Sequence, residues 1–262
     1  MKTIKPPAVA GLFYPAEAET LRQQVKGYIA AAQTLSPTPP KALIAPHAGY
    51  IYSGPIAGTA YASLQNAADQ IHRVILLAPA HRVAFRGIAY SSASHFQTPL
   101  GILPVDTALL EGLLHLAQLH QNDAAFAEEH SVEVHLPFLQ ETLDSFTILP
   151  LLVGDADAEE VAEILELTWN EQENLIVISS DLSHYLDYEA ATEMDLATSR
   201  AIESLQPGAL TYHSACGRIP VSGLLLVAKR HHLTGRTVDL RNSGDTAGSH
   251  DRVVGYGAYV FN

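Results

Sequence analysis

Short, continuously apolar runs alternate along the chain with longer stretches in which apolar residues recur at helical spacing. The apolar runs are rich in Val, Ile and Leu, and they lie at residues 42–45, 74–78, 147–153, 175–178 and 253–261. Runs of this length without polar alternation are typical of strands that are buried on both faces of a sheet. We therefore predict a buried strand at each of these positions.

The stretches between the runs predict amphipathic helices, because their apolar residues return every three or four positions. Leu21, Val25 and Ile29 set this spacing in the first helix, and Asp157 with Glu160 resembles a capping box at the start of a later one. The predicted helices cover residues 21–29, 55–68, 107–114, 157–169, 190–205 and 221–229. Glycine and proline within residues 87–104 predict a hairpin or an excursion from the main sheet.

Strands that alternate with helices are characteristic of the α/β class. We expect a single domain over residues 1–262, with a mostly parallel or mixed sheet flanked by helices on both faces. No repeat of fixed period divides the chain, and the proline-rich loop at residues 36–40 lies too near the amino terminus to separate two stable halves.

Composition narrows the possible partners and compartments. The 15 Lys and Arg residues against 28 Asp and Glu give a formal charge of -13, which argues against general binding to nucleic acid or anionic membranes. A single cysteine, Cys216, excludes an intrachain disulfide and favours a reducing compartment. No signal-like segment and no apolar run of roughly 18 residues appears, so we expect a soluble, cytoplasmic protein.

Three of the predicted strands are followed within a few residues by a histidine: His47, His81 and His184. The carboxyl ends of parallel strands share one edge of a sheet, where open α/β proteins place their ligand sites. Imidazole is the commonest protein metal ligand and the usual proton carrier near neutral pH. Each histidine alone is equally consistent with a hydrogen-bonded turn, but their shared position at strand ends predicts a metal site or acid/base chemistry.

The third of these histidines forms an Asp181-x-x-His184 pair. In a first helical turn the two side chains would lie on one side, where the carboxylate orients the imidazole as a general base. A simpler role for Asp181 is to cap the following helix, and the two roles are compatible.

The segment from His130 to His135 is dense in metal-binding side chains but differs from the zincin pattern. Its two histidines are five residues apart, so a regular helix or strand would point them in different directions. We expect a loop that leads into a helix at Pro137, with one histidine and Glu133 facing the cleft. The alternative is a solvated loop.

Cys216 lies before a helix expected to open at Pro220. Free cysteines are usually inert core residues, but Arg218 and the helix amino terminus are expected to favour the thiolate. We also place Tyr50 and Arg218 among the residues that surround the ligand. The turn at residues 242–245 offers Asp245 as a further, weaker candidate for the same cleft.

Several motifs together resemble the Memo family, also labelled AmmeMemoRadiSam system protein B. They are Gly11–Pro15, Ile44–Tyr50, Glu129–Pro137, Leu152–Gly154, Ser179–His184, Cys216–Arg218 and Ser243–Asp245. The resemblance covers nearly the whole chain and implies a fold shared with the class III extradiol ring-cleaving dioxygenases, which use non-haem iron.

The resemblance also implies metal ligands at His47, His81 and Cys216, with iron or copper as the metal and zinc as a further option. His184 falls at the position of the catalytic histidine of the dioxygenases, with Asp181 beside it. Those enzymes use a carboxylate where this chain has Cys216, which puts ring cleavage in doubt. A thiolate favours copper, zinc or ferrous iron over magnesium and calcium, and three protein ligands leave a position open.

Three hypotheses follow for function. The first is a metal-dependent redox protein of dioxygenase-like type, with His184 moving protons and His130, Glu133 and His135 shaping the pocket. The second is a non-enzymatic module that binds a peptide or partner protein in the same cleft. The third is a thiol hydrolase that uses Cys216, His184 and Asp181. The family label further implies a functional link to a radical SAM enzyme.

Overall fold

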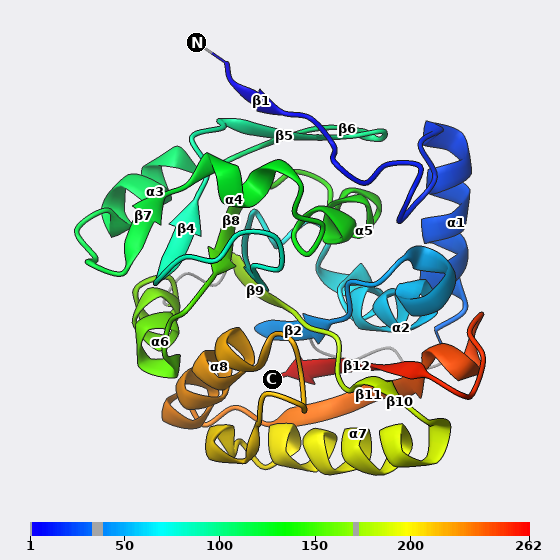
Figure 1. The fold of residues 1–262 in the computed structure, drawn as a ribbon. Helices are drawn as coiled ribbons and strands as arrows, with labels where there is room; N and C mark the ends of the chain where they lie inside the picture. The colour runs from blue at the N-terminus through cyan, green and yellow to red at the C-terminus, as the bar shows by residue number, and fades with distance from the viewer. Residues whose placement is uncertain (1, 33–38, 170–172) are drawn as a thin grey trace.

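The computed structural model describes residues 2–32, 39–169 and 173–262. Within them the chain forms an α/β domain with one large mixed sheet and one small three-stranded sheet (Figure 1). The helices are α1 (Ala18–Ala30), α2 (Tyr50–Ala62), α3 (Thr107–Leu113), α4 (Asp123–Ala127), α5 (Leu136–Thr142), α6 (Ala158–Leu167), α7 (Tyr188–Glu203) and α8 (Arg218–Arg230). The strands are β1 (Ile4–Lys5), β2 (Ala42–Ala45), β3 (Arg73–Pro79), β4 (Ile88–Tyr90), β5 (His95–Thr98), β6 (Gly101–Pro104), β7 (Leu119–Gln121), β8 (Thr147–Val153), β9 (Asn174–Ser179), β10 (His184–Leu186), β11 (Gly235–Asn242) and β12 (Val253–Phe261).

The large sheet is parallel at its centre, and an antiparallel pair joins the strands at each side to this centre. Its strand order is β10-β12-β2-β9-β3-β8-β4-β7, with β11 paired to β12. Strands β2, β9, β3 and β8 run parallel to their neighbours in this group. Strand β12 runs antiparallel to β2, and β4 runs antiparallel to β8. The predicted α/β class with a mixed sheet is therefore confirmed.

Each central strand is buried on both faces, which is why these segments read as continuous apolar runs. In β3, Val74 and Leu76 belong to the core under α1, α2 and α5. The alternate residues Ile75 and Leu77 belong to the core under α3, α6 and α8. Helices thus cover both faces of the sheet, with α1 and α2 on one side and α6 and α8 on the other (Figure 1).

Helix α2 differs from the prediction, because it begins at Tyr50 and continues through Pro55 to Ala62. Packing explains why the proline does not end it. Glycines at 54 and 58 let α2 lie directly against Tyr28 of α1, and a Cβ at Gly58 would come within 2.6 Å of the Tyr28 backbone carbon. Tertiary contact here outweighs the local helix-breaking tendency of proline.

The region 87–104 contains the predicted hairpin, formed by β5 and β6, and β5 also pairs with β1 in the small sheet outside the large one. Strand β4 from the same region instead joins the large sheet beside β8. The short strands β1, β7 and β10 and the polar strand β11 were not predicted. Residues 33–38, which include most of the expected proline-rich loop, lie outside the described residues.

The parallel strands β2, β9 and β3 are neighbours, so the segments that follow their carboxyl ends meet at one edge of the sheet. These segments carry His47, Asp181 and His81. Over the described parts of the chain, every helix is too short or too polar to cross a bilayer.

Candidate metal centre

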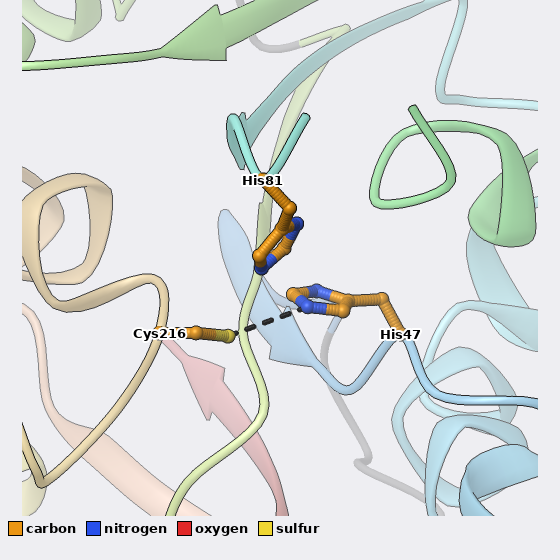
Figure 2. Close-up of side chains that lie close together, drawn as sticks. All are labelled: His47, His81 and Cys216. Atoms are coloured by element: carbon orange, nitrogen blue, oxygen red, sulfur yellow. Dashed lines mark hydrogen bonds between the residues drawn. The ribbon is translucent and has the colours of Figure 1, made fainter. Parts of the chain in front are cut away.

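Two histidines and the single cysteine converge at the carboxyl edge of the sheet (Figure 2). His47 follows β2, His81 follows β3, and Cys216 comes from the loop that leads into α8. One donor atom from each lies within 4.8 Å of the other two. The Cys216 sulfur is 3.3 Å from His47 Nε2. The three residues that the family resemblance implies as ligands are therefore close enough to hold one ion.

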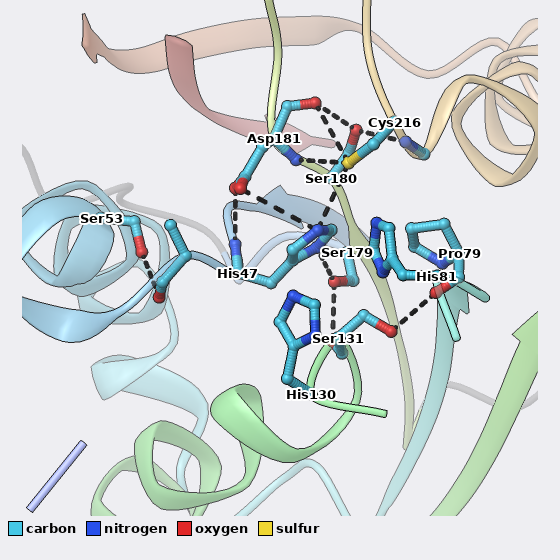
Figure 3. Close-up of polar contacts among 12 residues, drawn as sticks. His47, Ser53, Pro79, His81, His130, Ser131, Ser179, Ser180, Asp181 and Cys216 are labelled. Carbon is cyan, nitrogen blue, oxygen red and sulfur yellow. Dashed lines mark hydrogen bonds and ion pairs between the residues drawn. The ribbon is translucent and has the colours of Figure 1, made fainter. Parts of the chain in front are cut away.

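The hydrogen bonds around His47 fix which of its nitrogens faces the sulfur (Figure 3). The Ser179 hydroxyl donates its only proton to the Ser131 carbonyl at 2.8 Å. The same oxygen lies 2.5 Å from His47 Nδ1, so it must accept a proton from that nitrogen. In the neutral ring, Nε2 then carries a free lone pair directed at Cys216. Burial lowers the pKa of His47 well below its usual value, which keeps the ring in this ligating form.

Glu129 holds the ring of His81 by a hydrogen bond, as Ser179 holds the ring of His47. Its carboxylate accepts from His81 N at 2.6 Å and from His81 Nδ1 at 3.1 Å. Although burial opposes ionisation, contacts from His130 and His81 hold the pKa of the Glu129 carboxyl well below its usual range. An ionised partner on Nδ1 leaves Nε2 of His81 available as a ligand.

The Cys216 sulfur sits in a polar cradle formed by the chain after β9. It accepts a hydrogen bond from Asp181 N at 3.3 Å, and Cys216 N donates to the Asp181 carbonyl at 3.2 Å. Burial first, and then the charge of Asp181, raise the pKa of the thiol. The expected preference for the thiolate is thus wrong for the metal-free protein. Arg218 lines a cavity together with Cys216, and its guanidinium lies over the Tyr212 ring at 5.9 Å.

Two cavities flank this cluster. The larger, of about 700 Å³, is lined by His47, His81, His130, Asp181 and His184 among others. The smaller, of about 540 Å³, lies on the Cys216 side and is mainly apolar. His81, His184 and Tyr185 line both cavities, whereas His47 lines only the larger one and Cys216 only the smaller one.

Comparison with known proteins assigns the family. The family model described as "Memo-like protein" matches residues 5–260. The chain belongs to the Memo family. It is 34% identical over 269 residues to a MEMO1 family protein of Aquifex aeolicus, covering 98% of this chain and 99% of that protein. It is 35% identical over 284 residues to one of Ignicoccus hospitalis, covering 98% of each.

In this Memo-family chain, Asp181 and His184 do not form the expected helical pair. Residues 180–183 are irregular, β10 begins at His184, and α7 is capped by Asp187 instead. The Asp181 carboxylate accepts from His47 N at 2.8 Å. His184 Nδ1 lies 2.8 Å from the Leu182 carbonyl, to which it donates. Both residues nevertheless line the larger cavity.

The thiol hydrolase triad is not assembled either. Among the described residues, the imidazole in hydrogen-bond contact with the Cys216 sulfur is that of His47, which is a candidate ligand. The His184 ring makes its hydrogen bond with the backbone of Leu182. The geometry that the third hypothesis requires is therefore missing.

Of the segment from His130 to His135, only His130 faces the cleft. Its ring centroid lies 5.0 Å from that of His81 and 5.4 Å from that of His47. The expectation that Glu133 also faces the cleft is wrong, because residues 133–135 form a buried 3₁₀ turn. Glu133 accepts from Ala8 N at 2.6 Å and from the Tyr14 hydroxyl at 2.6 Å, so it anchors the amino-terminal segment.

Three further residues lie outside the larger cavity despite the prediction. His135 contacts the Tyr61 hydroxyl through Nδ1 at 2.9 Å inside the core. Tyr50 is buried and donates to the Val134 carbonyl at 2.6 Å. From the turn at residues 242–245 it is Ser243 that lines the cavity, whereas Asp245 accepts from the Tyr188 hydroxyl at 2.7 Å.

Glu129 and Ser179 are the functional residues that reasoning from the sequence missed. Glu129 had a signal, since a carboxylate stands directly before His130 in the motif. Ser179 had none, because a serine at the end of a buried strand has many possible partners. Each forms a hydrogen bond with the ring of a candidate ligand, and only the spatial arrangement reveals this.

Proposed function

We propose that this chain is a metal-dependent redox protein that holds iron or copper through His47 Nε2, His81 Nε2 and Cys216 Sγ. The observation that carries the proposal is that one donor atom from each of the three residues lies within 4.8 Å of the other two. Each histidine also has its other nitrogen engaged by an oxygen acceptor, the arrangement typical of metal-ligating histidines.

The donor set fits soft or borderline metals. Two imidazoles and a thiolate favour iron, copper or zinc over magnesium and calcium, which prefer oxygen ligands. Three protein ligands leave a position for a small molecule. Iron or copper bound here would supply one-electron chemistry, which zinc cannot.

A second group, His81 with Glu129 and His130, also has donor atoms within 4.8 Å of one another. We favour the first group because the Glu129 oxygens are already occupied. They accept from the backbone nitrogens of His81, His130 and Ser131 at 2.6 to 3.1 Å, as well as from His81 Nδ1. Glu129 therefore suits the role of an orienting residue better than that of a ligand.

His184 is the residue that we assign to proton transfer. Its Nδ1 donates to a backbone carbonyl, so in the neutral ring Nε2 accepts protons. The side chain is exposed and lines both cavities, where it meets a ligand and solvent. Asp181 would hold the backbone of His47 in place through its hydrogen bond from His47 N.

Metal analysis tests this proposal directly. Untagged protein purified without added metal should contain iron or copper, measured by inductively coupled plasma mass spectrometry. The His47→Ala, Cys216→Ala double variant should lose the metal, whereas His115→Gln, which changes an exposed histidine away from the site, should keep it. Full metal occupancy in the double variant would contradict the proposal. The proposal would also fail if Glu129→Gln loses the metal while the double variant retains it.

The second candidate function is a module that binds a peptide or a partner protein. Two aromatic side chains that line the smaller cavity support it, since Tyr185 is 64% exposed and Tyr212 is 79% exposed. Exposed aromatic residues beside a cavity are common in recognition surfaces. Tyr212→Ala should weaken capture of a partner without changing metal content if this function is correct.

Location in the cytoplasm and a link to a radical SAM enzyme also stay proposals.

A further inference from the structure

Two arginines line the larger cavity, which is also lined by the candidate metal ligands His47 and His81. Arg82 directly follows the ligand His81, and Arg252 directly precedes β12. Within the described parts of the chain, neither guanidinium has a carboxylate within 4.0 Å. Four arginines pair with a carboxylate, namely Arg22, Arg73, Arg230 and Arg241. Arg82 and Arg252 differ from the other arginines without such a partner because they line one cavity together. In a chain with 28 acidic and 15 basic residues, two arginines without a carboxylate partner in one cavity leave free donors.

Arg252 is held in place by an aromatic ring. Its guanidinium carbon lies 5.1 Å from the centroid of the Tyr185 ring. Tyr185 itself has a φ of 60°, the left-handed region that bulky side chains rarely adopt. Strain of this kind persists where surrounding structure enforces it, and it clusters at ligand sites. A guanidinium stacked on a ring keeps its N–H edges free to bind a carboxylate or phosphate group.

The remaining walls of the cavity suit an organic group. Phe13, Tyr52 and Tyr256 line it together with the two arginines. Its volume of about 700 Å³ is in the range of small-molecule sites. Among the described residues that line the cavity, Asp181 is the single carboxylate side chain, and it accepts a hydrogen bond from His47 N at 2.8 Å.

We infer that Arg82 and Arg252 form a subsite for the anionic group of an organic ligand, a carboxylate or a phosphate ester. The aromatic walls hold the rest of the molecule beside the candidate metal ligands. The subsite rests on the proposed function for the role of this ligand, and it adds to that function the chemical class of the substrate.

Binding of three matched probes tests the subsite. Benzoate, phenyl phosphate and benzyl alcohol share a ring and differ in their polar group. Isothermal titration at fixed ionic strength should detect binding of one or both anions and at least about tenfold weaker binding of the alcohol, as expected when charge-assisted hydrogen bonds are lost. Stronger binding of benzoate identifies a carboxylate site, and stronger binding of phenyl phosphate identifies a phosphate ester site. Equal binding of the alcohol would overturn the inference.

Variants locate the subsite. Arg82→Gln and Arg252→Gln should each weaken binding of the preferred anion about tenfold. The control Arg236→Gln changes an exposed arginine on β11 and should alter it less than about twofold. Tyr185→Phe should keep the affinity, whereas Tyr185→Ala should weaken it by removing the platform under Arg252. Wild-type affinity in the Arg82→Gln, Arg252→Gln double variant would overturn the inference.

The titrations are run on protein as purified and after removal of metal with a chelator, with the metal content measured in each sample. Loss of anion binding in the arginine variants at unchanged metal content supports the subsite independently of the metal. If the His47→Ala, Cys216→Ala variant keeps its metal while the arginine variants lose the anion, the proposed function fails and the subsite stands. If the metal behaves as proposed and no anion binds, the subsite alone fails.

Discussion

Replacing Glu129 with glutamine removes one of two buried oxygens that hold the His81 ligand. Oxygen Oε2 accepts from His81 N at 2.6 Å, and Oε1 accepts from His81 Nδ1, His130 N and Ser131 N at 3.1, 2.9 and 3.1 Å. Glutamine has one oxygen and one NH₂ group. Whichever way the amide turns, its nitrogen faces at least one N–H donor that has lost its acceptor.

The size of the effect follows from these contacts. A buried donor left without an acceptor costs about 1–3 kcal/mol, so we expect the free energy of unfolding of the metal-free protein to fall by about that amount. Loss of the residue that orients a ligand typically lowers metal affinity by about 10- to 100-fold, which is about 1.4–2.7 kcal/mol of binding free energy. The two effects are measured separately.

Chelator competition gives the metal affinity, and urea unfolding of the metal-free protein gives the stability. The matched control is Glu128→Gln, the same substitution at the neighbouring position, where the side chain is exposed. It should leave both quantities within about 0.5 kcal/mol of the wild type. The reasoning is refuted if Glu129→Gln binds metal as tightly as the wild type, or if both variants weaken binding equally.

Three other substitutions test separate parts of the structure. Burial raises the pKa of Asp195 to about 6, so its carboxyl binds a proton more tightly in the folded state, and stability should fall as pH rises from about 4 to 6. This loss of unfolding free energy is at most about 3 kcal/mol, and Asp195→Asn should abolish it. Urea unfolding of both proteins between about pH 4 and 6 measures the effect, and identical pH profiles for the variant and the wild type would contradict it. Ser179→Ala removes the acceptor of His47 Nδ1 and should weaken metal binding about 10- to 100-fold, measured by chelator competition. Unchanged metal affinity would show that Ser179 does not set the tautomer of His47. Glu133→Gln weakens the buried contacts to the amino-terminal segment, including the Tyr14 hydroxyl, and should destabilise the protein by about 1–3 kcal/mol. Limited proteolysis should then cut before Tyr14 faster than in the wild type, and equal rates would count against this anchor.

The sequence predicts the central strands and the amphipathic helices well because their periodicity reflects burial directly. Strands β2, β3, β8, β9 and β12 are continuous apolar runs that the folded sheet buries on both faces. Strands β1, β7 and β10 have two or three residues, which is too short for a pattern. Strand β11 is polar and half-exposed, so its existence depends on pairing with β12 and not on its own residues.

The strand-end positions of His47 and His81 are predictable from the chain, because parallel topology alone brings them to one edge. The role of Glu133 is not predictable in this way. The sequence indicates a loop before Pro137 but not the path of that loop, and its 3₁₀ turn directs Glu133 toward Ala8 and Tyr14 instead of the cleft. Asp181 fails as a helical partner of His184 for a similar reason, since the chain after β9 stays irregular as far as β10.

The geometry of the three candidate ligands is set largely by the end of β9, which contributes none of them. Ser179 fixes the ring of His47, and Asp181 N contacts the Cys216 sulfur. Gly217 N donates to Ser180 Oγ at 3.0 Å, and a Cβ at Gly217 would come within 2.5 Å of the Ser179 carbonyl oxygen. The Cys216 loop therefore reaches the histidines only because glycine follows the cysteine and packs against this strand end. A Cβ at residue 217 would force either the Cys216 loop or the end of β9 to shift, so the packing between residues 179–181 and Gly217 supports the geometry of the site.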